Sequence, residues 1–196
     1  MRAQFRPALV VLLILTAFTG LLYPLAMTGA GGLLFPDAAQ GSLVRGASGA
    51  PIGSRLIAQP FSGAGYFQPR PSAAAADASV SSGTNLGPTN AVRADSFQAR
   101  AGRRRAEDPA HAQAPIPADL LTASGSGLDP DLSPAAAQWQ ALRVAKTRGI
   151  TPAAVDSLIA VHTEGRLWGL FGEPRVNVLA LNLALDSLTP AMPASH

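Results

Sequence analysis

The side chains best suited to chemistry lie in one glycine-rich segment. It reads Thr122-Ala123-Ser124-Gly125-Ser126-Gly127-Leu128-Asp129-Pro130 and precedes a predicted helix. Free N–H groups and the helix dipole attract anions at such a place, but Asp129 and Asp131 already carry negative charge there. Two carboxylates without further ligands are weak support for a cation site. We therefore interpret the segment as a turn whose glycines allow positive φ and whose acids cap the helix.

Sequence templates for hydrolases, nucleotide-binding loops and metal sites are mostly missing. Ser124 and Ser126 lack the Gly-x-Ser-x-Gly spacing of a hydrolase, and Lys146, the single lysine, is not part of a phosphate-binding loop. No cysteine is present, which excludes thiolate chemistry. An exported hydrolase that pairs one of these serines with a histidine remains the enzymatic alternative. The histidines are scattered without metal-ligand spacing: His111, His162 and His196.

The charge balance argues against a nucleic-acid partner, although the isoelectric point is about 10.2. Of the 15 cations, Arg2 and Arg6 precede the first apolar run, which leaves 13 against 12 acids in the rest of the chain. The isoelectric point is high because almost all cations are arginines, which do not deprotonate below that pH. Charged residues are only 14% of the chain, against about 25% in a typical soluble protein.

An apolar run over residues 8–27 predicts a transmembrane helix. No charged residue occurs between Arg6 and Asp37, and 20 helical residues span roughly 30 Å, the thickness of the hydrocarbon core. A cleaved signal peptide is the alternative, because Thr28-Gly29-Ala30 would suit a peptidase. Signal-peptide cores are shorter than this run, so we favour the anchor. Thr16 and Gly20 have the four-residue spacing of small residues that allows close helix packing.

The position of the arginines predicts the orientation of this helix. Arg2 and Arg6 precede the run, and the next cation is Arg45. Cytoplasmic flanks carry the excess of positive charge, so residues 1–7 are predicted to form a cytoplasmic tail. The remainder would lie outside the membrane of the cell, as a single-pass protein of a bacterial inner membrane. The predicted fold class is an α+β extracytoplasmic domain anchored by one N-terminal transmembrane helix.

The exported part divides by composition into three stretches. Residues 28–40 are expected to be an exit linker made flexible by Gly29-Ala30-Gly31-Gly32. Residues 41–188 are expected to form the mixed α+β domain, and residues 189–196 a flexible tail. Between 41 and 90, short apolar pieces alternate with turn-forming residues, which predicts short strands and ordered turns.

Three helices are predicted in the second half of the chain. The first covers 92–106 and ends in the basic cluster Arg100–Arg105, read as a solvated last turn with an anionic-lipid or acidic-partner patch as the alternative. Ser133-Pro134 and Thr151-Pro152 each combine an N-cap hydroxyl with proline at the first helical position. The helix that starts at Pro134 is predicted to end at Gly149 and to place Gln140 and Arg143 together on one face. Its predicted buried stripe consists of small residues that imply close packing: Ala137, Ala141, Val144 and Ala145. The final element, 175–186, alternates apolar and other residues and predicts a core strand with a bulge or a switch of faces near Val178.

Several motifs in this order resemble those of KdpC, the C subunit of high-affinity potassium-transporting P-type ATPases. The resemblance covers nearly the whole chain and rests on six segments: 53–59 (GSRLIAQ), 66–73 (YFQPRPSA), 82–90, 121–130, 140–145 (Gln140, Arg143, Val144, Ala145) and 174–178 (PRVNV). It implies that residues of these segments serve the fold or a partner interface. These candidate site residues are Gln59, Tyr66, Phe67, Arg70, Pro71, Ser72, Asn85, Gly87, Asn90, Ser124, Gly127, Asp129, Gln140, Arg143 and Asn177.

The resemblance also implies a function. KdpC-like chains are accessory subunits, needed for assembly of the pump and described as catalytic chaperones that raise the ATP affinity of KdpB. The expected partners are KdpA-like, KdpB-like and KdpF-like subunits and membrane lipid, with ATP and Mg²⁺ bound at the level of the complex. No catalytic residue, metal site or cofactor is expected in this chain itself. Because an external domain cannot touch cytoplasmic ATP, we expect the effect to be indirect; a nucleotide-binding cofactor on the cytoplasmic side is the alternative.

Overall fold

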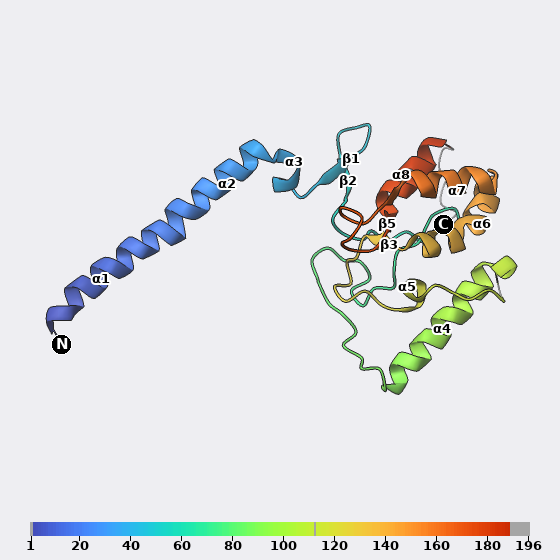
Figure 1. The fold of residues 1–196 in the computed structure, drawn as a ribbon, viewed down its shortest axis with the longest axis horizontal. Coiled ribbons are helices and arrows are strands. Elements are labelled where there is room, and N and C mark those ends of the chain that lie inside the picture. Colours follow the sequence, from blue (N-terminus) through green and yellow to red (C-terminus); the bar gives the residue numbers. More distant parts are fainter. Residues whose placement is uncertain (1, 112, 189–196) are drawn as a thin grey trace. The chain divides into compact units, whose positions relative to one another are not determined.

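A computed structural model describes residues 2–111 and 113–188 of the chain. The predicted tail 189–196, with His196, lies outside these residues. The chain divides after Ile52 into two compact units, a helical N-terminal unit and a mixed C-terminal unit (Figure 1).

The N-terminal unit is a continuous helix followed by a short turn and hairpin. Helix α1 (Arg2–Ala17) passes through the π-helical segment η1 (Phe18–Leu22) into α2 (Tyr23–Leu34). Among the described residues one helix, Ala3–Leu34, is long and apolar enough to cross a membrane, and an 18-residue window of it has a mean hydropathy of 2.3. Short helix α3 (Pro36–Ala39) and strand β1 (Leu43–Arg45) follow, and β1 pairs with β2 (Pro51–Ser54).

The helix continues beyond the predicted span, so the prediction of a flexible exit was wrong for residues 29–32. These residues are helical, and α2 ends only where Phe35 N–H donates to the Gly31 carbonyl. Glycine weakens a helix in water, but the neighbouring residues Leu25, Met27 and Leu33 favour helix. In an apolar environment, the backbone N–H and C=O groups also have to bond to each other, which favours a helix further.

The π-helical turn has a cause in the sequence. Pro24 has no N–H to give to the Gly20 carbonyl, and its ring needs room on that side of the helix. The chain widens just before it, where Tyr23 N–H donates to the Phe18 carbonyl five residues back. A π turn is therefore the local adjustment that lets the helix pass Pro24 without breaking.

The C-terminal unit combines a small antiparallel sheet with helices. Strand β5 (Arg175–Asn177) is central and pairs with β3 (Asp131–Leu132) and β4 (Thr163–Glu164). In this sheet Val176 lies opposite both Leu132 and Thr163. The helices are α4 (Ala91–Glu107), α5 (Ala118–Leu121), α6 (Pro134–Arg148), α7 (Pro152–Val161) and α8 (Val178–Leu188), with the 3₁₀ turn η2 (Pro109–His111).

The predicted helix starts and stops are confirmed. Ser133 Oγ accepts a hydrogen bond from Ala136 N–H at 3.1 Å, and Thr151 Oγ1 accepts one from Ala154 N–H at 3.3 Å. Gly149 ends α6 in the left-handed conformation, with φ of 67°, as a glycine at this position does. Helix α4 matches the predicted 92–106 to within one residue at each end.

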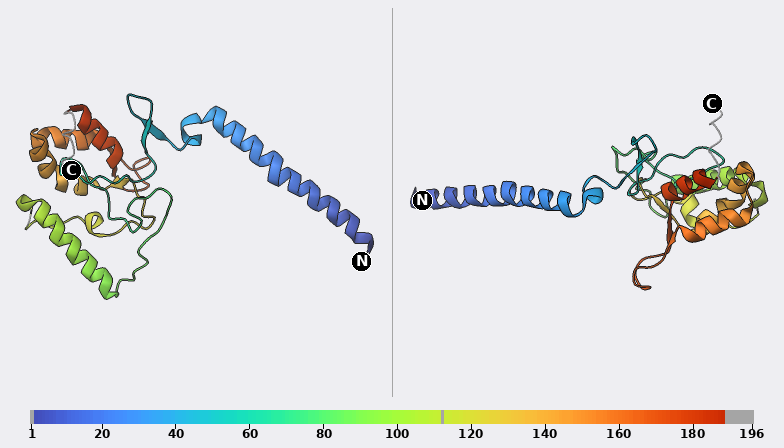
Figure 2. Two further views of the ribbon diagram at one scale, coloured as in Figure 1. Left: turned by 180° about the vertical axis from the view of Figure 1, so that it is seen from behind. Right: turned by 90° about the horizontal axis from the view of Figure 1, so that it is seen from above.

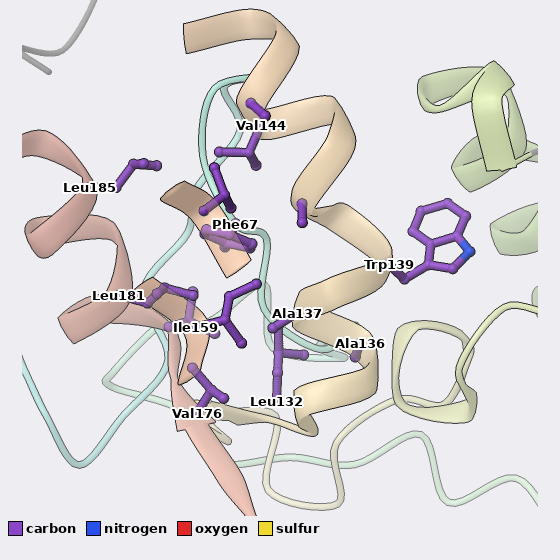
Figure 3. Packing of buried hydrophobic residues seen from close by; sticks show 14 of the residues in the cluster. Phe67, Leu132, Ala136, Ala137, Trp139, Val144, Ile159, Val176, Leu181 and Leu185 are labelled. Atoms are coloured by element: carbon purple, nitrogen blue, oxygen red, sulfur yellow. The ribbon is translucent and has the colours of Figure 1, made fainter. Parts of the chain in front are cut away.

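One side chain from an irregular segment completes the core between the helices. Phe67 is fully buried and lies between α6, which carries Val144, and α8, which carries Leu181 and Leu185 (Figure 3). Trp139 lies on the opposite side of α6 from Phe67, where its ring is 5.7 Å from that of His111. The small stripe predicted on α6 is buried, which allows close packing: Ala137, Ala141, Val144 and Ala145.

Two sequence predictions were wrong. Of the short strands predicted between 41 and 90, only β1 and β2 are present, and residues 55–90 contain no helix or strand. The predicted strand 175–186 ends at Asn177 and continues as α8. Leucine, alanine and asparagine alternate in 178–186, but none is β-branched after Val178, and leucine and alanine favour helix. The buried side chains follow helical spacing: Val178, Leu179, Leu181, Asn182 and Leu185.

Candidate functional site

Three buried polar side chains hold the irregular segment 64–68 on the helices. Asn182 of α8 accepts a hydrogen bond from Phe67 N–H and donates to the Phe67 carbonyl, both at 2.9 Å. Gln140 of α6 does the same for Gln68, at 2.9 and 3.2 Å. Arg143, one turn on, donates to the carbonyls of Ala64 and Tyr66 and to Gln140 Oε1. We call Gln140, Arg143 and Asn182 the polar clasp.

The polar clasp supplies backbone hydrogen bonds to a segment that is not part of any sheet. Buried N–H and C=O groups must be paired, and the side-chain amides of Gln140 and Asn182 each pair with both backbone groups of one residue. Three of the motif residues, Phe67, Gln140 and Arg143, are buried and therefore have a structural role. Asn182 was not predicted; an asparagine among leucines in the last apolar segment was the signal for it.

Burial shapes the electrostatics of the clasp. It lowers the pKa of Arg143, and the nearby Arg104 lowers it further. Arg104 is buried as well and donates to Gln68 Oε1 and to Glu107 Oε2. The prediction of a solvated last turn is therefore wrong for Arg104, whereas Arg103 and Arg105 are exposed.

An ion pair between Arg148 of α6 and Asp186 of α8 holds the side chain of Tyr66 in place. The guanidinium of Arg148 lies 4.5 Å from the centre of the Tyr66 ring and 2.7 Å from Asp186 Oδ1. The Tyr66 hydroxyl donates to Asp186 Oδ2 at 3.2 Å. This stacking arrangement attaches the same irregular segment to the ends of both helices.

The glycine-rich loop 122–130 is a structural turn, as predicted. Arg70 Nη1 lies 2.8 Å from Asp129 Oδ2, and Ser72 Oγ donates to the Gly127 carbonyl at 2.7 Å. Gly127 has φ of 72°, and Ser124 N–H donates to the Pro71 carbonyl at 2.9 Å. The predicted capping of α6 by the acids of this loop is wrong, because Ser133 is the cap and Asp129 pairs with Arg70.

The two serines of this loop bond to their own turn. Ser124 Oγ lies 3.2 Å from Ser126 Oγ and accepts from Gly127 N–H, and Ser126 Oγ accepts from Leu128 N–H. His162 Nδ1 instead lies 3.0 Å from the Leu158 carbonyl oxygen. Within the described part of the chain no serine–histidine hydrogen bond occurs, so the geometry of a serine hydrolase is not assembled there. No three His, Cys, Asp or Glu residues within it gather as metal ligands.

The remaining motif residues serve local turns and caps. Gln59 donates to the carbonyls of Ser54 and Ile57. Asn90 Oδ1 accepts from Val92 N–H and so caps α4, at the end of a loop in which Asn85 and Gly87 are exposed. Asn85 has φ of 53°, which asparagine tolerates better than most residues.

Asn177 joins the sheet to α8 and to a carboxylate. Its Oδ1 accepts from Ala180 N–H, and its Nδ2 donates to the Arg55 carbonyl and to Asp131 Oδ1. Burial raises the pKa of Asp131, against the opposing effects of this hydrogen bond and of Arg175, whose Nε lies 3.2 Å from Asp131 Oδ2.

An open groove beside the clasp has a mixed lining. Its volume is about 640 Å³, and its walls include Glu107, Asp108, Leu142, Arg143 and Lys146. Two acids beside two cations give it no net charge, and no glycine-rich phosphate loop borders it. In the N-terminal unit, Gly20 is open on its surface, with only Thr16 within 4 Å of the position of a Cβ.

Sequence reasoning missed one exposed segment. Between β4 and β5, Leu167, Trp168, Leu170 and Phe171 are all largely exposed. The run LWGLF between Arg166 and Gly172 was the available signal, because large apolar residues seldom gather in a loop without a partner.

Comparisons with known proteins agree with the motif resemblance. The family described as "KdpC: K+-transporting ATPase, c chain" matches residues 5–187. A protein of Variovorax paradoxus, named potassium-transporting ATPase KdpC subunit, is 55% identical over 97% of this chain and 100% of its own length. Proteins of the same name from Sorangium cellulosum and Bradyrhizobium diazoefficiens are 54% and 52% identical, each over 95% of this chain and 98% of its own. The chain therefore belongs to the KdpC family, the c chains of K⁺-transporting ATPases.

Proposed function

We propose that this chain is a non-catalytic accessory subunit of an ATP-driven potassium uptake pump. The observation that carries the proposal is that the motif side chains are used within the fold: the polar clasp, Arg70 and Ser72 all bond to its own backbone or side chains. Relatives of the same length and motif order carry the name of a potassium-transporting ATPase subunit. A rigid domain with its polar side chains occupied suits assembly better than catalysis.

The proposed placement is a single pass through a bacterial inner membrane. The long apolar helix Ala3–Leu34 supports the span, and Arg2 and Arg6 before it support a cytoplasmic N-terminus. The C-terminal domain would then lie outside, beside KdpA-like, KdpB-like and KdpF-like subunits and membrane lipid.

The proposed effect on ATP is indirect. In this placement ATP and Mg²⁺ bind to another subunit, and the chain raises the ATP affinity of KdpB by contacting one conformation of the pump more favourably than another. A partner can shift a conformational equilibrium only by such a difference in binding. This keeps the chaperone role and requires no nucleotide site in the external domain.

The test is to express the three partner subunits with and without this chain. We expect the complete complex to purify together, and the preparation without the chain to lose assembly or to need more ATP for half-maximal hydrolysis. Photo-crosslinking of an ATP analogue to this chain in sealed vesicles of known orientation would overturn the indirect role. A reporter at the C-terminus that faces the cytoplasm would favour the alternative, a cytoplasmic nucleotide-binding cofactor.

A further inference from the structure

The loop between β4 and β5 presents a concentrated apolar surface. We call residues 167–171 the apolar tip. Trp168 is 81% exposed and Leu170 is 74% exposed, and Leu167 and Phe171 beside them are each 61% exposed. In the right-hand view of Figure 2 the segment between α7 and α8 extends away from the helices of its unit. Such a group of four large apolar side chains in water is costly unless something covers it.

Four of the five backbone N–H groups of the apolar tip donate to carbonyls of residues 166–171. Leu167 N–H donates to the Phe171 carbonyl at 2.8 Å, and Phe171 N–H donates back at 3.0 Å. Gly169 N–H donates to Arg166 and Leu170 N–H to Leu167, at 3.0 and 3.1 Å. Trp168 and Gly169 have positive φ, 53° and 73°, which is the conformation of a tight hairpin turn. The tip therefore needs no hydrogen-bonding partner for these donors.

The charges near the apolar tip are neutralised at its base. Arg166 Nη2 and Glu173 Oε2 lie 2.7 Å apart, and no charged residue occurs between them. Trp168 and Phe171 contact edge to face, with ring centres 6.2 Å apart. The apolar tip is thus an uncharged group of aromatic and aliphatic side chains, flanked in the sequence by one ion pair.

We propose that the apolar tip inserts into the surface of a lipid bilayer and forms a second membrane contact of the chain. Lipid offers no hydrogen-bond partners, so a segment enters it at lower cost when most of its backbone N–H groups are paired internally, as four of the five are here. Tryptophan prefers the interface between headgroups and acyl chains. The helix Ala3–Leu34 of the same chain keeps a bilayer within reach of the domain, which raises the effective concentration of lipid at the tip. A protein surface is the competing occupant, but it would normally offer polar groups that this tip cannot use.

Tryptophan fluorescence tests the proposal with the full-length chain, reconstituted alone into phosphatidylcholine vesicles. The chain has two tryptophans, Trp139 and Trp168, and the membrane helix has none. Trp139→Phe leaves Trp168 as the reporter, and Trp168→Phe leaves the buried Trp139 as the matched control. We expect lipids brominated on the acyl chains near the headgroup to quench emission in Trp139→Phe and to leave Trp168→Phe unchanged. In vesicles, the emission maximum of Trp168 in this variant should also lie at a shorter wavelength than that of a tryptophan exposed to water.

A second label keeps the test independent of the Trp139 substitution. The chain has no cysteine, so Leu170→Cys and the exposed Thr89→Cys can each carry one environment-sensitive dye. We expect the dye at position 170 alone to gain emission in vesicles. Equal accessibility to water at both positions and no bromine quenching of Trp168 would overturn the proposal. So would shielding of Trp168 that occurs only when the partner subunits are added and without quenching by brominated lipid, an outcome that assigns the tip to a protein interface. Neither result bears on the pump role, which the proposal does not need.

Discussion

Asn182 has a larger structural role than its size indicates. It is buried in α8, and its side-chain amide is the hydrogen-bonding partner of both backbone groups of Phe67. Asn182→Leu keeps the number and branching of the side-chain heavy atoms, although leucine is bulkier, and it leaves a buried N–H and a buried C=O of Phe67 unpaired. We expect it to lower the free energy of unfolding by about 3 kcal/mol, measured by chemical unfolding in detergent and followed by the near-ultraviolet circular dichroism of the aromatic side chains.

Asn90→Ala is the matched control for this substitution. Asn90 also accepts a backbone N–H, but on the surface, at the start of α4. Losing an exposed helix cap costs about 1 kcal/mol. Similar losses for the two variants would contradict the role of Asn182 in holding Phe67.

Asp131 gives a prediction about pH. Burial raises its pKa above the ordinary 3.8, so between these two pKa values the folded chain binds more protons than the unfolded chain. The contribution of Asp131 to the free energy of unfolding therefore falls as pH rises through this window. Asp131→Asn cannot titrate, and we expect its stability relative to wild type to rise with pH, measured by thermal unfolding at pH values from 3.8 upward. A relative stability that falls with rising pH would mean that the attraction to Arg175 dominates.

The residues of the candidate site could be identified from the sequence better than their roles could. Gln140 and Arg143 were placed together on one face of a helix, and they hydrogen bond at 2.8 Å. Their actual partners, the backbone of residues 64–68, lie more than 70 positions away in the chain, and no periodicity indicates such a pairing. Helical spacing therefore predicts neighbours on one helix but not what those neighbours bind.

At the scale of elements, local signals were reliable where they act locally. N-cap hydroxyls, proline at the first turn and Gly149 defined α6 and α7 correctly. The alternating pattern over 175–186 failed because its leucines suit a helix as well as a strand, and packing against Phe67 and α7 buries a helical stripe instead. Alternation without β-branched residues is thus weak support for a strand.

The turn 122–130 offers a test with two glycines two residues apart. At Gly127, φ is 72° and a Cβ would lie 2.6 Å from the Ser82 carbonyl oxygen. At Gly125, φ is not positive and nothing lies within 4 Å of a Cβ. We expect Gly127→Ala to lower the free energy of unfolding by about 2 kcal/mol or more, through strain and the clash, and Gly125→Ala to leave it nearly unchanged. Chemical unfolding of both variants measures this, and equal effects would show that the loop moves freely away from Ser82.

At the scale of the whole molecule, the sequence indicates membrane association more directly than it indicates the fold. Absence of charge between Arg6 and Asp37 is enough to predict an apolar helix, and the structure extends that helix to Leu34. The arrangement of the C-terminal unit depends instead on the irregular segment 55–90, which bonds to distant parts of the chain. Residues 64–68 bond to α6 and α8, and residues 71–82 bond to the turn 122–130. The sequence therefore suffices to predict the N-terminal helix, which forms without tertiary contacts. It does not suffice for the C-terminal unit, whose arrangement depends on pairs of residues far apart in the chain.

The helix that stands alone should have partners of its own in the assembled pump. Gly20 lies in the π-helical segment, and only Thr16 comes within 4 Å of the position of its Cβ, at 3.9 Å. Gly20→Leu should therefore leave the isolated chain folded, since leucine favours a helix more than glycine does, but it fills the surface on which a partner helix could approach closely. We expect less of the partner subunits to purify with this variant. Gly29→Leu is the control, because Gly29 is equally open but lies beyond the predicted span 8–27. Undiminished co-purification of the Gly20 variant would exclude close packing at Thr16 and Gly20 and would leave the C-terminal domain as the part of the chain that holds the complex together.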